Sequence, residues 1–359
     1  MCFLRLIRSR RVGPATFHRL MAEYGSASAA LQALPEIAAE AGMTDYETCP
    51  EGVAAAELAA GRRIGARLIR CDSPDYPGML RQIDGAPPIL WVRGDPAWLS
   101  RNPIAVIGAR NASSLGLRMA RGMSAGLAEA GQTVIAGLAR GIDTAAHNAA
   151  LPTGTVAVMA GGIDVIYPAE NAVLAAQIAE KGALVSEQPP GTEPAARHFP
   201  TRNRIISGLS HAVVVIEAAH RSGSLITAKN ALDQGRDVMA VPGHPMDARA
   251  AGCNMLIRDG AVLVRNSADV MAGLTRSGDR HDLPPCTENP PSPPDHRRAL
   301  AAPDDIEARI LSHLTPSPTE ENDLIRGLGL TTQHASAAIL SLELQGRLIR
   351  MAGGRLALN

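Results

Sequence analysis

The chain has 359 residues, 46% of them apolar and only 3% aromatic, so its cores must be built mainly from Ala, Val, Ile and Leu. This length and composition are typical of an α/β protein with two or three domains. The 35 basic residues are balanced by 35 acidic ones, which excludes a global field that would attract a polyanion. A polyanionic partner would therefore have to be held by a local cationic patch.

Cysteine usage and hydropathy indicate the cellular environment. The cysteines are odd in number, scattered and never spaced as C-x-x-C, which argues against a disulfide framework and against a zinc site. They are Cys2, Cys49, Cys71, Cys253 and Cys286. No stretch reaches the roughly 18 consecutive apolar residues of a membrane-spanning helix. We expect a cytoplasmic protein without a bound metal or cofactor.

Residues 1–60 predict a small helical domain. The stretch RVGPATFHRLMAEYGS places Gly-Pro between a basic segment and an amphipathic helix, as in helix-hairpin-helix and SAM-like modules. Residues 1–22 carry five Arg and no acid, so weak phosphate contact is one interpretation. A packing module with a solvated basic face is the other, and we favour it. Residues 61–102, rich in Pro and containing both Trp, predict an extension wrapped on the next domain.

Residues 61–275 predict an extended Rossmann-like α/β domain. From about Pro103, short apolar strands alternate with helical segments that mostly end in Gly, which indicates a parallel sheet covered on both faces. The predicted strands are residues 104–109, 133–137, 155–162, 183–188, 212–218, 237–243 and 261–264. The predicted helices are residues 117–131, 142–151, 171–182 and 224–235. Ligands of such sheets bind beyond the carboxyl ends of the strands.

A Pro-rich linker is predicted over residues 276–302, because six of the twelve residues in 283–294 are Pro. After it, three helical segments and a Gly-Gly turn between two short strands predict a winged-helix domain over residues 303–359. Seven acids against five Arg make this domain too acidic for a strong duplex reader. We favour a protein-docking module, or one that touches nucleic acid only through Arg347, Arg350 and Arg355.

Four loops of the central domain combine cations with glycines, and all follow strands of the predicted parallel sheet. Their candidate anion-binding residues are Gly108 and Arg110; Arg140 and Gly141; Arg197, His198, Phe199, Arg202, Asn203 and Arg204; and Ser222, Gly223, Ser224 and Lys229. A single loop Arg is ordinarily a solvated surface residue. Because four loops place cations at one edge of the sheet, we expect a shared anionic ligand.

The fourth loop, SGSLITAK, opens a helix directly after a strand, which lets backbone N–H groups face an anion. It lacks a nucleotide-binding signature, since the chain contains neither G-x-x-x-x-G-K-[ST] nor a G-x-G-x-x-G after a strand. Phe199 stands among cations in RHFPTRNR, where it predicts a stacking platform for unpaired bases; a core anchor is the alternative.

The acidic residues and the histidine near these loops have structural interpretations. Asp143 is expected to cap the helix that follows it, and His147 to be packed or solvated rather than catalytic. Glu187 and Glu217 end strands at the site edge. Pairing with nearby Arg and a functional role both remain open for these two residues.

Several runs then resemble, in order, the DNA-processing protein A family (DprA, also called Smf). They include GARNASSLGLRMA, AGLARGIDTAAH, GGIDVIYPAEN, HFPTRNRIISGLS and EAAHRSGSLITA, within about residues 60–275. The family's Gly-Ser-Arg loop appears as Gly108-Ala109-Arg110, and its Ser-Gly-x-Ala-x-Gly-Ile-Asp loop begins with Ala136 instead of Ser. The resemblance implies a cytoplasmic, dimeric, non-enzymatic protein. It would protect single-stranded DNA taken up in natural transformation and help load the RecA recombinase.

Two other function classes are compatible with parts of the sequence. Related Rossmann-like enzymes hydrolyse nucleoside monophosphates with a P-G-G-x-G-T turn and a nearby Glu, but here Ala228, Lys229 and Asn230 follow the turn, so the obvious general base is missing. A docking scaffold centred on the winged helix is the third possibility.

Overall fold

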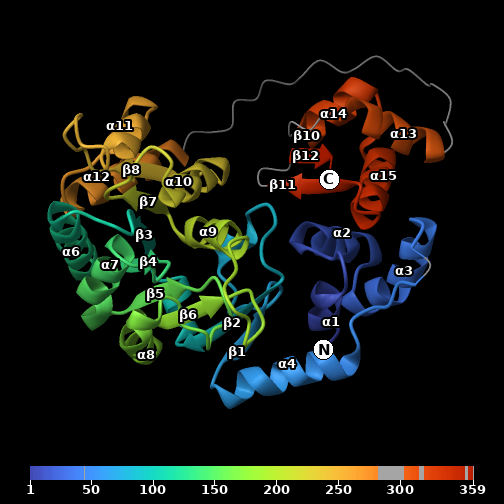
Figure 1. The fold of residues 1–359 in the computed structure, drawn as a ribbon, viewed down its shortest axis with the longest axis horizontal. Helices are drawn as coiled ribbons and strands as arrows, with labels where there is room; N and C mark the ends of the chain where they lie inside the picture. Colours follow the sequence, from blue (N-terminus) through green and yellow to red (C-terminus); the bar gives the residue numbers. More distant parts are fainter. Residues whose placement is uncertain (44, 282–302, 315–318, 352–354, 359) are drawn as a thin grey trace. The chain divides into compact units, whose positions relative to one another are not determined.

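The computed structural model describes residues 1–43, 45–281, 303–314, 319–351 and 355–358 (Figure 1). Internal contacts divide the chain into two compact units, Gly52–Gly278 and a second one made of Met1–Glu51 with Asp279–Asn359. In the described part of the chain, no helix is long and apolar enough to cross a membrane. The predicted linker begins at 276, but residues 276–281 continue a helix, and 282–302 lie outside the described residues.

The unit Gly52–Gly278 is built on a nine-stranded sheet in the order β1-β2-β6-β5-β4-β3-β7-β8-β9. The strands are β1 (Arg67–Arg70), β2 (Ile89–Gly94), β3 (Pro103–Ile107), β4 (Thr133–Ala136), β5 (Thr155–Val158), β6 (Ala183–Ser186), β7 (Ala212–Val215), β8 (Asp237–Ala240) and β9 (Val262–Leu263). From β6 to β9 all neighbours are parallel, whereas β1 and β2 are antiparallel additions. This confirms the Rossmann-like α/β fold and the seven predicted strands.

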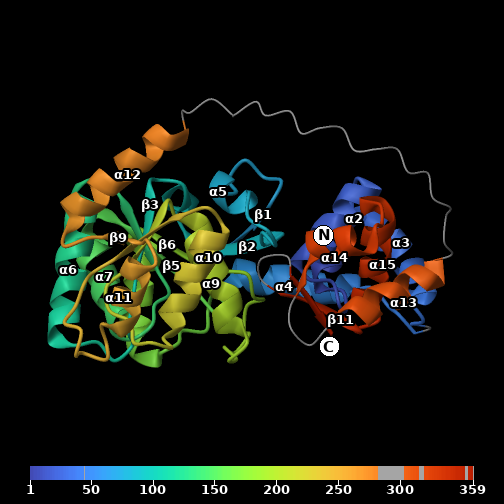
Figure 2. The same cartoon turned by 90° about the horizontal axis from the view of Figure 1, so that it is seen from above.

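Helices cover both faces of the sheet (Figure 2). They are α4 (Glu51–Arg63), α5 (Gly78–Arg81), α6 (Ser114–Glu129), α7 (Ile142–Ala150), α8 (Ala172–Lys181), α9 (His198–Leu209), α10 (Gly223–Asp233), α11 (Ala251–Arg258) and α12 (Ser267–His281). Ile104 and Val106 of β3 pack on the side of α6 and α7. The alternate residues Ala105 and Ile107 belong to the core beneath α9 and α10, so β3 is buried on both faces.

The structure differs from the sequence prediction in two places. The segment after β6 was predicted as a loop, but residues 198–209 form α9; Pro200 lies in its first turn, where a missing N–H is tolerated. The Trp-containing extension is part of the sheet as β1 and β2. Its buried Trp91 donates from Nε1 to Glu57 of α4 at 3.0 Å.

The second unit contains the helices α1 (Cys2–Arg8), α2 (Pro14–Tyr24) and α3 (Ala27–Glu40) and the predicted winged helix. The latter comprises α13 (Pro303–His313), β10 (Thr319–Glu320), α14 (Glu321–Leu328), α15 (Thr332–Leu344), β11 (Leu348–Met351) and β12 (Arg355–Leu358). Its three strands pair in the order β10-β12-β11, and its helices share one apolar core. The winged-helix fold is thereby confirmed.

Within this unit, the end of α15 contacts α2 and the segment before it through charged groups. Arg19 donates to the Ser336 carbonyl at 3.2 Å and lies 3.5 Å from the Glu343 carboxylate, while Arg11 donates to the Leu344 carbonyl. Arg350 pairs with Glu343 at 2.9 Å and also with Glu321. Arg350, one of the three Arg of the nucleic-acid alternative, thus has its guanidinium part-buried between two carboxylates of its own domain.

Candidate functional site

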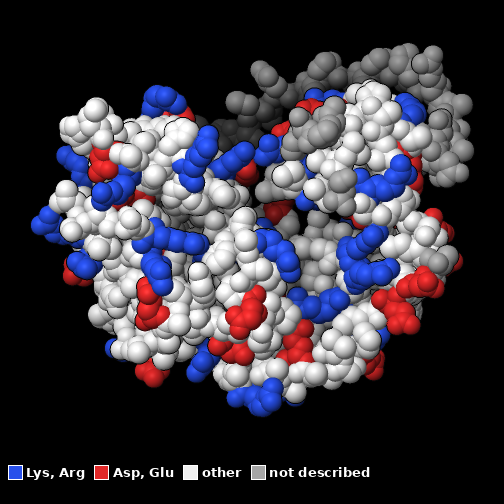
Figure 3. All heavy atoms as spheres, in the orientation of Figure 1, with Lys and Arg blue, Asp and Glu red and all other residues white. Residues whose placement is uncertain are grey.

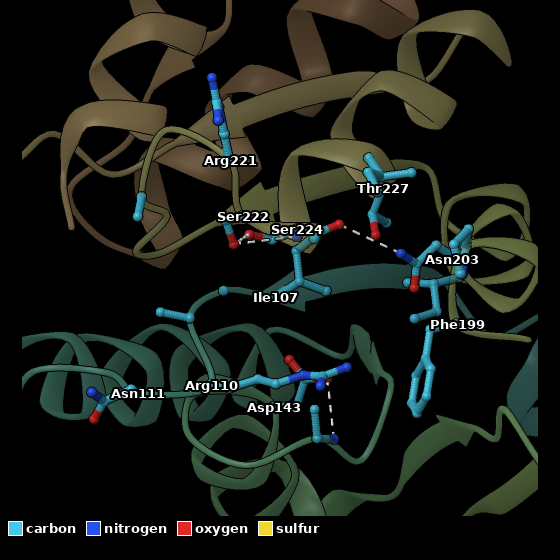
Figure 4. Close-up of a pocket in the computed structure, with 18 of the residues that line it drawn as sticks. Ile107, Arg110, Asn111, Asp143, Phe199, Asn203, Arg221, Ser222, Ser224 and Thr227 are labelled. Atoms are coloured by element: carbon cyan, nitrogen blue, oxygen red, sulfur yellow. Dashed lines mark hydrogen bonds between the residues drawn. The ribbon is translucent and has the colours of Figure 1, made fainter. Parts of the chain in front are cut away.

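A pocket of about 710 Å³ lies where the strand order of the sheet reverses. The chain passes from β3 through β4 and β5 to β6, then crosses by α9 to β7 on the other side of β3. The loops after β3 and β7 therefore lead in opposite directions and leave a crevice, the usual ligand site of such sheets. Figure 4 shows the loops after β3 and β7 and the start of α9 around this pocket.

The N-terminus of α10 forms one wall of the pocket. Ser222 is the N-cap of this 11-residue helix, and its hydroxyl lies 2.7 Å from that of Ser224. Ser222, Gly223 and Ser224 all line the pocket. The first backbone N–H groups of a helix are not used within the helix and carry its positive dipole end, so this wall suits an anion.

The nearby N-terminus of α6 is closed by an internal carboxylate. Glu217 accepts hydrogen bonds from the Ser113 backbone N–H at 3.1 Å and from its hydroxyl at 2.7 Å. Gly116 permits this approach, because a Cβ there would lie 2.0 Å from Glu217 Oε2. Glu217 thus has a structural role in fixing the loop after β3, and its charge is already bound.

Arg110 and Phe199 meet at the pocket. The Arg110 guanidinium lies over the Phe199 ring, 5.0 Å from its centroid, and both residues line the cavity (Figure 4). The Phe199 ring also meets Tyr167 in an edge geometry, with centroids 5.8 Å apart. Phe199 is half-buried, so it is neither a core residue nor a fully exposed ring.

Arg202 lines the pocket but is only 6% exposed. Its Nη1 donates to the carbonyls of Gly137 and Val158, at 2.7 Å each, which ties the ends of β4 and β5 together. Burial lowers the pKa of Arg202 to about 10, so it remains charged at neutral pH. The predicted role of Arg202 as a loop cation is therefore corrected to a buried support of the site.

Asp143 belongs to the same buried arrangement. It does not cap α7, whose N-cap is Gly141; its carboxylate accepts from the N–H groups of Gly137 at 2.9 Å and Ala139 at 3.4 Å. Burial raises the pKa of the Asp143 carboxyl, and the charge of Arg202 opposes that rise. The expected capping role of Asp143 was wrong.

Gly141 has a positive φ of 77°, and a Cβ there would lie 2.4 Å from the Ala109 carbonyl. The loops after β3 and β4 can approach each other because this residue is a glycine.

Two further predicted cations are paired on the protein itself. Arg204 donates from Nη2 to both oxygens of Glu187, at 2.8 and 2.7 Å, in a part-buried pair that gives Glu187 a structural partner. Arg140 pairs with Glu170 at 2.9 Å, but this pair is exposed, at 63% and 54% of the two side chains. Exposed pairs contribute at most about 1 kcal/mol, so Arg140 can exchange its partner at low cost.

The structure brings eight of the fourteen predicted residues together around the pocket. These are Gly108, Arg110, Phe199, Arg202, Asn203, Ser222, Gly223 and Ser224. The six that do not line it are Arg140, Gly141, Arg197, His198, Arg204 and Lys229. Burial and Arg197 lower the pKa of His198, so its ring adds no positive charge at neutral pH. Lys229 is exposed in the second turn of α10.

Sequence reasoning missed two cations that line the pocket, Arg221 and Arg249. Arg221 directly precedes the Ser-Gly-Ser turn, so its position was a usable signal; in Figure 4 its side chain points away from Arg110. Arg249 lies after β8 in a segment without any motif. Among the residues that line the pocket, Asp143 is the one carboxylate, and two N–H groups already hold it.

His147 is packed, as expected. It is fully buried, and its Nδ1 lies 2.9 Å from the Thr155 hydroxyl, which donates to the Val134 carbonyl at 2.6 Å. Because the Thr155 hydroxyl uses its proton in that bond, it accepts a hydrogen bond from His147, whose ring then carries its proton on Nδ1. Burial lowers the pKa of His147 to about 3, so the ring is neutral at pH 7.

Basic and acidic side chains occur together on the face of the molecule that Figure 3 shows. Figure 3 shows basic side chains spread over one face with acidic ones among them, as the equal numbers of the two kinds imply. Among the described residues, no group of three His, Cys, Asp or Glu could hold a metal ion.

Known proteins of one family match the chain along most of its length. The family described as DNA recombination-mediator protein A matches residues 67–275, a DprA-like N-terminal HHH domain matches 1–60, and a DprA winged helix domain matches 291–354. Protein Smf of Escherichia coli is 39% identical over 295 residues, which are 81% of this chain and 77% of that protein. DNA processing protein DprA of Streptococcus pneumoniae is 45% identical over 199 residues, 55% of this chain and 70% of that one.

Solved structures show the same likeness. The X-ray structure of DNA processing protein A from Streptococcus pneumoniae has a TM-score of 0.62 and 33% identity, covering 75% of this chain and 95% of that one. DNA processing protein A from Helicobacter pylori, whose structure concerns its single-stranded DNA binding mode, has a TM-score of 0.53 and 25% identity. It covers 58% of this chain and 99% of that one.

Proposed function

Because this chain belongs to the DNA recombination-mediator protein A family, we propose that it binds single-stranded DNA in the pocket between the β3 and β7 loops. The observation that carries the proposal is the Arg110–Phe199 pair facing the N-terminus of α10 across that pocket. Cations and backbone N–H groups suit phosphates, and an aromatic ring beside them suits an unpaired base. We expect little sequence preference, because phosphate contacts are the same for every base and every base has a face that can stack.

The test is a titration of the full chain with short single-stranded and duplex oligonucleotides at several salt concentrations. Preference for the single strand, with affinity that falls as salt rises, supports the proposal. Arg110→Ala should weaken binding, whereas Lys181→Ala should not. Lys181 is an exposed cation at the end of α8, just before β6, so it lies at the opposite edge of the sheet. Equal loss in both variants, or a preference for duplex, would reject the site.

We propose that the protein acts as a mediator of recombination and not as an enzyme. The pocket lacks an unengaged carboxylate that could serve as a general base, since Asp143 is buried and hydrogen-bonded. Incubation with nucleoside monophosphates, followed by chromatography of the products, separates this from the nucleotide-hydrolase alternative. Any Arg110-dependent hydrolysis would overturn the mediator assignment.

The remaining parts of the proposal come from the family resemblance. We propose that the protein is a cytoplasmic homodimer that protects incoming single strands during natural transformation and loads RecA on them. Sedimentation over a range of concentrations tests the dimer. Nuclease digestion of the bound strand tests protection. RecA-dependent strand exchange on DNA coated with a single-strand-binding protein tests loading, with Arg110→Ala as the binding-deficient control.

A further inference from the structure

We propose that Tyr167 forms a second stacking site, for an unpaired base of the same DNA strand, beside the pocket. This inference rests on the proposed single-strand binding and extends it along the sheet edge. Tyr167 does not line the pocket and was not among the candidate residues from the sequence. The position and the exposure of Tyr167 are the two observations that support its binding of a base.

The exposure of Tyr167 is unusual for this chain. Aromatic residues make up only 3% of the sequence, and Tyr46 and Tyr76 are buried. Tyr167 is 53% exposed, although it has a large apolar ring. A solvated aromatic face next to cations is the element that single-strand-binding grooves use to hold bases.

The geometry of the aromatic pair leaves Tyr167 as the more accessible platform. The Arg110 guanidinium already lies over the Phe199 ring. Tyr167 meets that same ring at an interplanar angle of 62°. An edge contact of this kind fixes the position of the Tyr167 ring without covering both of its faces.

The location of Tyr167 indicates in which direction the bound DNA strand would leave the pocket. Tyr167 lies in the segment between β5 and α8, and β5 is separated from β3 by β4 alone. The Tyr167 ring centroid lies 5.8 Å from that of Phe199, which lines the pocket. That distance corresponds to about two nucleotides at the roughly 3.4 Å rise of a stacked strand. A DNA strand bound in the pocket can therefore reach Tyr167 within a few nucleotides.

A cation for the phosphates of the intervening DNA backbone is held by the segment that carries Tyr167. Arg140 follows β4 and pairs with Glu170, three residues after Tyr167, at 2.9 Å. Since this pair is exposed and weak, a phosphate can replace the Glu170 carboxylate. Arg140 thus lies outside the pocket, after the strand that separates β3 from β5, and is available to a phosphate of a DNA strand that runs from the pocket to Tyr167.

Photocrosslinking of the unmodified protein tests the contact directly. Oligothymidylates with a single 5-iodouracil at successive positions are bound to the full chain, irradiated, and the linked peptide is identified by mass spectrometry. We expect one set of positions to link to Phe199 and another, displaced by about two nucleotides, to link to Tyr167. Links to Phe199 in the absence of any link to Tyr167 would overturn the inference and leave the proposed function intact.

Substitutions supply the energetic test. Tyr167→Ala and Tyr167→Leu should raise the Kd for an oligothymidylate by about 5-fold or more, because the loss of one stacked base costs that much or more. Tyr167→Phe should bind like the wild type. Val173→Ala, which shortens another exposed apolar side chain on α8, is the matched control. If Tyr167→Ala binds as tightly as Val173→Ala, the second stacking site is overturned. If the wild type does not bind single-stranded DNA at all, the proposed function and this inference both fail.

Discussion

The guanidinium of Arg110 lies 5.0 Å from the centroid of the Phe199 ring, and the two residues come from segments about 90 positions apart. One residue offers a charge and the other an apolar face, so their substitutions should differ. Arg110→Ala should weaken single-strand binding and lower the slope of log Kd against log salt by about one unit, if it meets one phosphate. Phe199→Ala should cost about 1 to 3 kcal/mol with an unchanged slope, because a stacked ring releases no counterions.

Melting curves of the same two variants provide the control for this prediction. Phe199 is half-buried and packs on Tyr167, so its truncation should lower the melting temperature only slightly. A large fall in melting temperature combined with normal binding in the cold would show that Phe199 is a core anchor and not a stacking platform.

Arg202→Ala should act on stability instead of on charge. The substitution leaves the buried carbonyls of Gly137 and Val158 without their donor and removes the charge that opposes the pKa rise of Asp143. Breaking a buried charge arrangement of this kind costs about 3 kcal/mol or more. Urea unfolding of Arg202→Ala and of Arg197→Ala, which removes an exposed cation a few residues earlier, should separate the two positions. Equal stability of both variants would contradict the buried role of Arg202.

Glu170→Gln should strengthen single-strand binding by about 2- to 5-fold at low salt. The substitution frees the Arg140 guanidinium and removes a negative charge near the path of the strand, and exposed pairs of this kind are worth at most about 1 kcal/mol. Glu180→Gln changes the net charge equally but lies at the other end of α8. The gain in affinity should disappear at high salt. A gain of the same size for Glu180→Gln would show that the effect comes from net charge alone and not from the release of Arg140.

The stability of the protein should fall in acid because of His147. Its pKa in the folded state is about 3, against 6.5 for an unperturbed histidine, so between these values the unfolded chain binds a proton that the native state does not. Above pH 6.5 the protonation of His147 does not lower the free energy of unfolding. Below pH 6.5 it lowers that free energy by about 1.4 kcal/mol per pH unit. His147→Gln should flatten the pH dependence of the unfolding free energy between pH 6.5 and 4. If the unfolding free energy of His147→Gln depends on pH as steeply as that of the wild type, groups other than His147 cause the loss of stability in acid.

The strand pattern of the fold was predictable, because apolar runs that alternate with helical periods leave few arrangements other than a parallel sheet. The site was predictable only to the level of its loops. Arg202 and Arg204 stand two positions apart, and once residues 198–209 form α9 they point in different directions, one into the core and one to Glu187. A sequence shows that both are cations but not which face of an unrecognised helix each occupies. Arg249 joins the pocket through tertiary folding alone.

The contact of Arg19 with Glu343 joins helices from the two ends of the chain, so the unit that contains them is discontinuous in sequence. A ribosome releases Arg19 more than 300 residues before Glu343. Because domains generally fold as they emerge, the sheet unit Gly52–Gly278 can form first, while the N-terminal helices wait for the winged helix. Contacts of such high sequence separation close slowly, so we expect the docking of the N-terminal helices onto the winged helix to be a late step of folding.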